Sequence, residues 1–316
     1  MSAPPPRPSS TIDAALARRR FGRAVATPAA FAAYRDAAIL QREVARRMLE
    51  RLDYVRLDPA LVIDAGCGVG HALPGLRGRF PAARLLAVDF ALPMLLRARA
   101  AANAEQRIHV PDWLRRLLPA AGEHRQHALA ADFGRLPLRD ASVDCIWSNL
   151  ALHWHDDPAS LFAEWHRVIK TGGLVQFSLL GPDTLRELRS ACAHLPGVRV
   201  HPFIDMHDIG DMLVHAGFAD PVMDMEVITL TYRTTDQLLA ELRALGAANA
   251  SAERPRGLTG VRGWAAMRAA YDTLRSDGTL PATFEIVYGH AWKPAPRAGR
   301  DGVAVVRVED IGRRRR

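Results

Sequence analysis

The sequence has little cysteine, almost no lysine and no long apolar run. Its three cysteines form no CxxC pair and leave an odd count, which disfavours a disulfide framework and favours a reducing cytoplasm. No stretch approaches the roughly 18 apolar residues of a membrane span, and the Pro- and Ser-rich first ten residues lack the apolar segment of a signal peptide. We therefore expect a cytoplasmic protein with no membrane partner.

Excess basic charge is also absent from most of the chain, although the 316 residues carry a formal net charge of +8. Residues 1–25 hold +4 and residues 293–316 hold +5, which leaves −1 for residues 26–292. All basic side chains except Lys170 and Lys293 are arginines, and alanine is abundant. That pattern is more typical of a GC-rich genome than of selection for phosphate contacts, so we expect no nucleic-acid partner.

The chain does have enough apolar residues for a globular core. Hydrophobic residues make up 49% of the sequence and charged residues 24%, a balance that excludes wholesale disorder. At about 150 residues per domain, the length allows one large domain or two modest ones. We expect a mobile tail over 1–20, one folded domain over 21–292 and a basic tail over 293–316.

Apolar positions switch between helical and strand-like spacing along the domain. Helical spacing predicts a helix over 31–57, and short apolar runs that alternate with helices then predict an α/β fold. Such a fold is a doubly wound, mostly parallel sheet with helices on both faces. The expected strands are 61–63, 85–88, 127–131, 143–147 and 174–180, and the expected helices include 72–79, 91–102 and one that begins after Asp157-Pro158.

Two long insertions interrupt this alternation. Residues 103–126 form a polar insertion, and residues 234–277 form a helical insertion before the last strand. Strand-like runs at 222–231 and 283–288 flank the second insertion. We expect these two runs to pair at the edge of the sheet, and the helical insertion to cap the functional site.

A strand that runs into a glycine-rich turn is the strongest functional signal. Asp64 precedes Gly66, Gly68 and Gly70, so the backbone can approach a ligand and the next helix points its N-terminus at it. A dinucleotide fingerprint needs a further glycine three positions after the second, and in both possible registers that position holds another residue. The turn therefore disfavours NAD, and the acid before it suits a cationic amino-acid moiety.

Acidic residues also end the next two strands. Asp89 follows about twenty residues later, where it can bind ribose hydroxyls. Asp132, followed by Phe133, ends the third strand, where the pair can meet an adenine ring. An adenosine with an amino-acid part is the ligand that this set of side chains predicts.

Together these residues resemble the class I S-adenosylmethionine-dependent methyltransferases. The resemblance implies a seven-stranded Rossmann-like sheet, with S-adenosylmethionine as the cofactor. The matching positions are Asp64, Gly66 and Gly68 in the first motif, Asp89 as the ribose-binding acid, Asp132 and Phe133 on the adenine side, Asn149 within a fourth motif at 144–154, and residues 167–173 in a glycine turn.

Further segments resemble one subfamily, the BioC-type malonyl-[acyl-carrier-protein] O-methyltransferases of biotin synthesis. This resemblance spans about residues 20–292 and implies an N-terminal lid helix that contains Tyr34. The chain departs from the subfamily pattern in a longer spacing between Phe21 and Tyr34, and in Ala37 at a common histidine position. The matching segments are 21–24, 40–42, 147–151, 181–188, 203–207, 242–246 and 283–290.

The subfamily resemblance implies that the methyl acceptor is the free carboxylate of malonyl on an acyl-carrier protein. A carboxylate is ionised at pH 7, so the reaction needs alignment and exclusion of water rather than a general base. Arg186 and Arg189 are candidates for holding the carboxylate, and Tyr34 is a candidate for covering the site. The alternatives are a solvated helix face for the arginines and a packed helix contact for Tyr34. We expect a monomer whose basic ends attract an acidic carrier protein.

Other functions remain open on the residues alone. Related proteins include small-molecule methyltransferases and a mitochondrial complex I assembly factor that hydroxylates an arginine, so hydroxylation or non-catalytic binding of S-adenosylmethionine are alternatives. His153, His155 and Asp157 resemble the opening of a metallo-hydrolase zinc motif, but Pro158 stands where that motif continues with His. We expect no metal and interpret the run as a strand end with a helix cap. Trp154 within it belongs either to the acceptor pocket or to the core.

Overall fold

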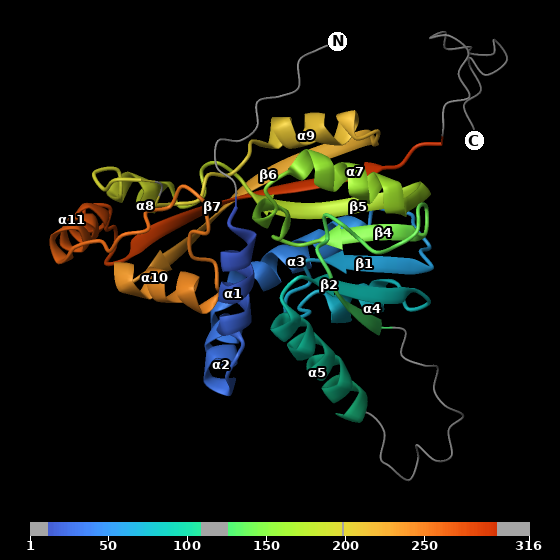
Figure 1. Cartoon of the computed structure of the whole chain (residues 1–316), viewed down its shortest axis with the longest axis horizontal. Coiled ribbons are helices and arrows are strands. Elements are labelled where there is room, and N and C mark those ends of the chain that lie inside the picture. The colour runs from blue at the N-terminus through green and yellow to red at the C-terminus, as the bar shows by residue number, and fades with distance from the viewer. Residues whose placement is uncertain (1–11, 109–125, 198, 296–316) are drawn as a thin grey trace, which may run out of the picture.

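One sheet organises the residues that this computed structural model describes, namely 12–108, 126–197 and 199–295. Within those residues seven strands lie in the order β3-β2-β1-β4-β5-β7-β6 (Figure 1). Neighbouring strands from β3 to β5 run parallel, whereas β7 lies antiparallel between β5 and β6. The prediction of a doubly wound, mostly parallel, seven-stranded sheet is confirmed. The strands are β1 (Leu61–Ala65), β2 (Arg84–Asp89), β3 (Gln126–Ala130), β4 (Val143–Ser148), β5 (Ile169–Leu180), β6 (Ala219–Tyr232) and β7 (Leu280–Trp292).

The strand order reverses beside β1. The chain adds β2 and β3 on one side of β1 and then crosses to add β4 and β5 on the other. In open α/β sheets, ligands bind outside the carboxyl ends of the strands at such a reversal. The glycine turn that follows Asp64 leaves β1 at this edge, so the fold places it where a ligand is expected.

Helices cover both faces of the sheet (Figure 1). On one face, Met48 of α3 belongs to the same buried cluster as Val62 of β1, and on the other face Phe162 of α7 clusters with Ile63. Successive strand residues point to opposite faces, so consecutive apolar residues such as these two serve both layers. The helices are α1 (Ala14–Ala24), α2 (Pro28–Ala37), α3 (Ile39–Leu52), α4 (Leu73–Arg79), α5 (Leu92–Ile108), α7 (Pro158–Val168), α8 (Arg186–Ala191), α9 (Met206–His215), α10 (Thr235–Ala244) and α11 (Val261–Asp272), with a 3₁₀ turn η1 (Leu152–Trp154).

Three predicted local structures form as expected. The helix after Asp157-Pro158 is α7, where the Asp157 carboxylate accepts a hydrogen bond from the Ser160 amide (3.1 Å) and Pro158 occupies the first turn. The runs at 222–231 and 283–288 pair within β6 and β7. The residues between those strands contain α10 and α11, so the helical insertion before the last strand is also confirmed. Figure 1 shows both helices beside α8, near the ends of β6 and β7.

The single helix predicted over 31–57 is wrong. Two helices, α2 and α3, meet at Ala38, whose backbone leaves the helical region (φ −77°, ψ 37°), and α3 ends at Leu52. Ala38 is fully buried, so the bend sits against the core and turns α2 away from the axis of α3. The break allows Tyr34 of α2 to contact the glycine turn while α3 packs on the sheet.

The expected tail over 1–20 is too long, because α1 begins at Ala14. Asp13 caps this helix by accepting a hydrogen bond from the Leu16 amide (2.9 Å). The same carboxylate pairs with Arg254 of the helical insertion (3.0 Å), and Arg20 donates to the carbonyls of Ala248 (2.8 Å) and Asn249 (2.7 Å). Contacts with residues more than 200 positions away therefore hold α1 in place.

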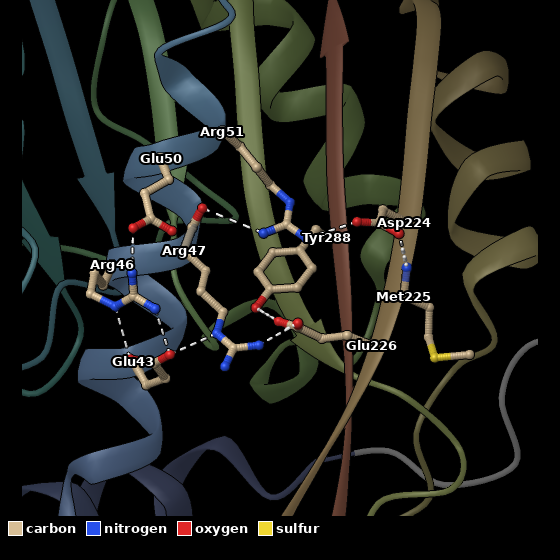
Figure 2. Close-up of polar contacts among 9 residues, drawn as sticks. All are labelled: Glu43, Arg46, Arg47, Glu50, Arg51, Asp224, Met225, Glu226 and Tyr288. Atoms are coloured by element: carbon tan, nitrogen blue, oxygen red, sulfur yellow. Dashed lines mark hydrogen bonds and ion pairs between the residues drawn. The ribbon is translucent and has the colours of Figure 1, made fainter.

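A polar network joins α3 to β6 and β7 (Figure 2). Arg47 pairs with Glu226, which also accepts a hydrogen bond from the Tyr288 hydroxyl. Arg51 pairs with Asp224 (2.7 Å) and lies 3.8 Å from the centre of the Tyr288 ring. Single exposed ion pairs contribute little, but a shared network with a cation–π contact fixes relative position. The network therefore fixes the position of α3 against β6 and β7 at the edge of the sheet.

Several predictions lie outside the described residues. These are residues 1–11 of the first tail, residues 109–125 of the polar insertion, and the basic tail from residue 296 onward. The beginning of the expected polar insertion, up to Ile108, belongs to α5. Across the described ranges, no helix combines the length and apolar character needed to cross a bilayer.

Candidate active site

A cavity of about 830 Å³ opens at the carboxyl edge of β1, β2 and β4. Its two ends are lined by different parts of the chain. At one end lie residues of the glycine turn and of the strand ends beside it, which we call the cofactor end; they are Asp64, Gly66, Gly68, Asp89 and Phe133. At the other end, which we call the acceptor end, lie residues of α1, α8, the helical insertion and the segment 199–203.

Asp64 brings a buried carboxylate without a partner to the cofactor end. It is 2% exposed, and its Oδ2 atom has no hydrogen-bond partner among the described residues. Burial first, and the charge of Asp89 second, raise the pKa of Asp64 to about 8. An uncompensated carboxylate in such a place is complementary to a cation, and a perturbed pKa in a cavity is typical of a binding site.

Asp89 holds the glycine turn in shape. Its Oδ2 accepts a hydrogen bond from the Gly68 amide (2.9 Å) and its Oδ1 accepts one from the Ala91 amide (2.7 Å). Burial raises the pKa of Asp89 to about 6, against the lowering effect of these two bonds. Since a carboxylate offers about four lone-pair sites, each oxygen can still accept a hydroxyl group of a ligand.

Two glycines of the turn are required by its backbone and its surroundings. Gly66 and Gly68 both have positive φ, at 76° and 55°, a conformation that side chains with a Cβ disfavour. A Cβ on Gly66 would also lie 2.3 Å from the Ala151 side chain. The turn therefore packs against the segment after β4 with no room for a side chain.

The residues predicted for the adenine side separate in the structure. Phe133 is buried and lines the cavity, and its carbonyl accepts a hydrogen bond from the Trp165 indole (3.0 Å). Asp132 is exposed and accepts a hydrogen bond from the Gly134 amide (2.8 Å). Asp132 is not among the described residues that line the cavity, so it shapes the turn that presents Phe133.

Asn149 connects the end of β4 to α3. Its side-chain amide donates to the Gln41 carbonyl (2.9 Å), and its oxygen accepts a hydrogen bond from the Ser178 hydroxyl (3.0 Å). Asn149 and Gln41 both line the cavity. The structure thus brings together six of the seven residues predicted for cofactor binding: Asp64, Gly66, Gly68, Asp89, Phe133 and Asn149.

Tyr34 lies over the glycine turn. It is 7% exposed, its ring is parallel to that of His71 with the ring centres 6.2 Å apart, and its hydroxyl lies 3.5 Å from where a Cβ of Gly68 would stand. Burial raises the pKa of Tyr34 well above its ordinary value. The hydroxyl therefore keeps its proton at pH 7 and is a neutral hydrogen-bond donor at the cavity wall.

Arg186 and Arg189 are not among the described residues that line this cavity, although Arg189 lines a smaller adjoining pocket that shares Cys192 and Phe203 with it. Arg186 is more than half exposed and pairs with Asp183 (3.4 Å). Arg189 donates to the carbonyls of Pro182 (2.7 Å) and Thr184 (3.1 Å). On α8 it is Leu188 that lines the cavity, because the apolar face of this short helix turns inward and leaves the arginines on the outer face.

A cluster of aromatic side chains forms part of the wall at the acceptor end, and the sequence did not predict it. Trp154 lies edge-on to Phe21 (4.9 Å between ring centres) and parallel to His201 (6.2 Å), while Phe203 lies edge-on to His153 (5.6 Å). Burial lowers the pKa of His153 to about 3 and that of His201 to about 4, so both rings are neutral. Of the two interpretations of Trp154, the structure favours the pocket.

The histidine run at 153–157 has local roles. His155 Nδ1 accepts a hydrogen bond from the Asp157 amide (3.2 Å) at the start of α7, and His153 faces the aromatic cluster. Over the described ranges, no three His, Cys, Asp or Glu side chains come together in a way that could hold a metal ion.

Comparison with known sequences finds close relatives over nearly the whole chain. Residues 63–177 match the family described as "Methyltransferase domain". A malonyl-[acyl-carrier protein] O-methyltransferase of Gallionella capsiferriformans is 47% identical, over 94% of this chain and 97% of that protein. An identically named protein of Nitrosospira multiformis is 48% identical, over 90% and 91% respectively.

Solved structures agree in fold. A putative methyltransferase of Bacillus halodurans aligns with a TM-score of 0.54 at 16% identity, over 80% of this chain and all of that chain. Phosphoethanolamine N-methyltransferase 2 of Haemonchus contortus, solved with S-adenosyl-L-methionine, aligns with a TM-score of 0.51 at 16% identity, over 88% of this chain and 60% of the other. At this level of identity the agreement concerns the fold alone.

Proposed function

The chain belongs to the family of malonyl-[acyl-carrier protein] O-methyltransferases, and from this premise we propose that it methylates the free carboxylate of a malonyl group on an acyl-carrier protein, a step of biotin synthesis. The protein is a methyltransferase, and its cofactor is S-adenosylmethionine. The observation that carries the proposal is the sequence identity of 47% to a malonyl-[acyl-carrier protein] O-methyltransferase, over more than nine-tenths of both chains. The cavity, with its cofactor and acceptor ends, fits that activity.

The donor set of the cofactor end fits S-adenosylmethionine. When bound, this cofactor supplies an electrophilic methyl group on a sulfonium sulfur. The unpartnered carboxylate of Asp64 is complementary to the cationic amino group. Asp89 retains acceptor sites for the ribose hydroxyls, and the buried ring of Phe133 offers an apolar face to the adenine.

The acceptor end needs to align and desolvate the carboxylate rather than deprotonate it. A carboxylate is already ionised at pH 7, and the two histidines of the aromatic cluster are neutral. Apolar walls exclude water and hold the acceptor oxygen in line with the methyl carbon and the sulfur. Positioning of this kind can lower a barrier by about 7–11 kcal/mol.

Tyr34 is the side chain that we propose to hold the carboxylate at the methyl group. Its protonated hydroxyl lies at the cavity wall beside Gly68. A neutral acyl group would leave this buried donor without a partner, which favours malonyl over acetyl. Arg186 and Arg189 do not line this cavity, so we do not assign them this role. Since one chain lines both ends of the cavity, we propose that the monomer is active.

Product analysis tests the proposal. The protein is incubated with methyl-labelled S-adenosylmethionine and malonyl-carrier protein, and we expect a base-labile methyl ester on the malonyl group. If the acyl group carries no label although calorimetry shows that the cofactor binds, the proposal is wrong, and hydroxylation or another acceptor would have to be sought. Growth of a biotin-requiring strain that lacks this methylation step, after the gene is supplied, is the matching genetic test.

A further inference from the structure

The outer surface of the helical insertion combines exposed apolar side chains with arginines that have no partner. Leu258 is fully exposed, Val261 is 87% exposed and Trp264 is 37% exposed. Arg256 and Arg262, which alternate with them, are exposed and make no side-chain hydrogen bond or ion pair with the described residues. We call these five residues the rim surface.

The charge of this stretch is of one sign. Residues 254–268 contain four arginines and no acidic residue. Two of the four are used within the fold, since Arg254 pairs with Asp13 (3.0 Å) and Arg268 with Asp236 (2.7 Å). Arg256 and Arg262 are left to face solvent. Exposed apolar groups beside unpaired cations favour an acidic partner that also offers apolar contacts.

The same segment forms one wall of the cavity. Val261 and Trp264 line the cavity from α11, although both are also exposed on the rim surface. The same cavity reaches the cofactor end, and its other lining residues include the apolar side chains of Leu188, Leu239 and Phe284 and the charged side chains of Glu241 and Arg243. A substrate tethered to a large carrier by a long, narrow arm fits this geometry, because the carrier can stay outside while the arm reaches the methyl group.

We propose that the rim surface docks the acidic acyl-carrier protein and that the arm bearing the malonyl group enters the cavity past Trp264. This inference rests on the proposed function. Arg256 and Arg262 pair with acidic side chains of the carrier, and Leu258 and Val261 contact its apolar surface. The docking site therefore lies in the folded part of the chain, and not only in its basic ends.

The test reverses the charges of Arg256 and Arg262 and compares two methyl acceptors. The double variant Arg256→Glu/Arg262→Glu is assayed with malonyl-carrier protein and with malonyl-pantetheine, which has the arm but no carrier. We expect kcat/KM for the carrier substrate to fall at least about tenfold, mainly through KM, and its salt dependence to weaken. Activity on malonyl-pantetheine should equal that of the wild type. Arg84→Glu is the matched control, because Arg84 is exposed at the amino end of β2, and it should change neither activity.

Each other outcome overturns the inference in a recognisable way. Equal kcat/KM for the carrier in wild type and double variant would show that the carrier docks elsewhere. Equal losses on both acceptors would show that the arginines support the site and not docking. A wild-type dimer that the double variant dissociates, in sedimentation velocity, would show that the surface binds a second copy. Failure of the wild type on both acceptors would instead refute the proposed function.

Discussion

The two ends of the cavity are built in different ways. The cofactor end takes its polar groups from two consecutive strand ends, Asp64 and Asp89, and from the turn between them. The acceptor end draws on α1, η1, the segment 199–203 and the helical insertion, which are far apart in the sequence. The first is built on two acids and a turn held by backbone hydrogen bonds, and the second combines an aromatic cluster with aliphatic and charged side chains. Specificity for the cofactor is thus encoded locally, and specificity for the acceptor arises only in the folded chain.

The largest expected effect comes from a substitution that impairs the cofactor end alone. Asp64→Asn should weaken S-adenosylmethionine binding by about 100-fold, or about 2.7 kcal/mol, because the cationic amino group loses its buried partner. Calorimetry measures the affinity, and Asp132→Asn is the control, since Asp132 is exposed outside the cavity. A similar loss in both variants would contradict the role that we give to Asp64.

The Asp64→Asn variant also makes the pH dependence of cofactor binding a test of the cofactor end. The pKa of Asp64 is raised to about 8, and binding a cation favours the ionised carboxylate, so protonation competes with binding below pH 8. We expect the ratio of wild-type to Asp64→Asn affinity to fall as the pH is lowered from 8 to 6. The titration of the cofactor's own amino group affects both affinities equally, so it cancels in their ratio. A ratio independent of pH would mean that Asp64 is already ionised in the free protein.

A smaller effect is expected for the second acid of the cofactor end. Asp89→Ala should weaken S-adenosylmethionine binding at least about tenfold, or about 1.4 kcal/mol, because both the ribose contacts and the hydrogen bond to Gly68 are lost. Calorimetry with adenosine alone should show a comparable loss, whereas methionine alone should lose less affinity than adenosine. Unchanged affinity for adenosine would place the ribose elsewhere.

Over the glycine turn, Tyr34→Phe should affect the acceptor and spare the cofactor. The loss of one hydrogen bond, about 1 kcal/mol, predicts a roughly fivefold lower kcat/KM for the malonyl substrate. Cofactor affinity should change less than twofold, because the ring and its contact with His71 remain. The decisive measurement is the affinity for malonyl-carrier protein relative to that for acetyl-carrier protein, which binds but has no carboxylate to methylate, and a variant that keeps the wild-type ratio would reduce Tyr34 to a packing residue.

The smallest effect is expected outside both ends. Arg186→Ala and Arg189→Ala should each change kcat/KM by less than about twofold, since exposed ion pairs and bonds to loop carbonyls contribute little. Steady-state assays with malonyl-carrier protein measure this. A large rise in KM in either variant would contradict this expectation and support the hypothesis that these arginines hold the carboxylate.

The difference between the ends also explains what the sequence could predict. Asp64, the glycines and Asp89 are recognisable because a strand, a tight turn and a helix constrain neighbouring positions. Phe133 was predicted from its place after a strand end, whereas Asn149 was predicted only from the resemblance to the methyltransferase family. The role predicted for Arg186 and Arg189 stays a prediction, because the direction of α8 depends on tertiary packing of Leu188, which no local pattern records, and neither arginine lines the main cavity. The break at Ala38 was missed because alanine favours helix, and only the fully buried contact there selects the bend.

The contacts between α1 and the helical insertion have a consequence for turnover. Asp13 holds Arg254, and Arg20 holds the carbonyls of Ala248 and Asn249, so the two segments that flank the acceptor end are fastened to each other. An outward movement of one segment without the other would break these three contacts. We therefore expect the two segments to move together when product leaves, so that substitutions in either segment change the same step of turnover.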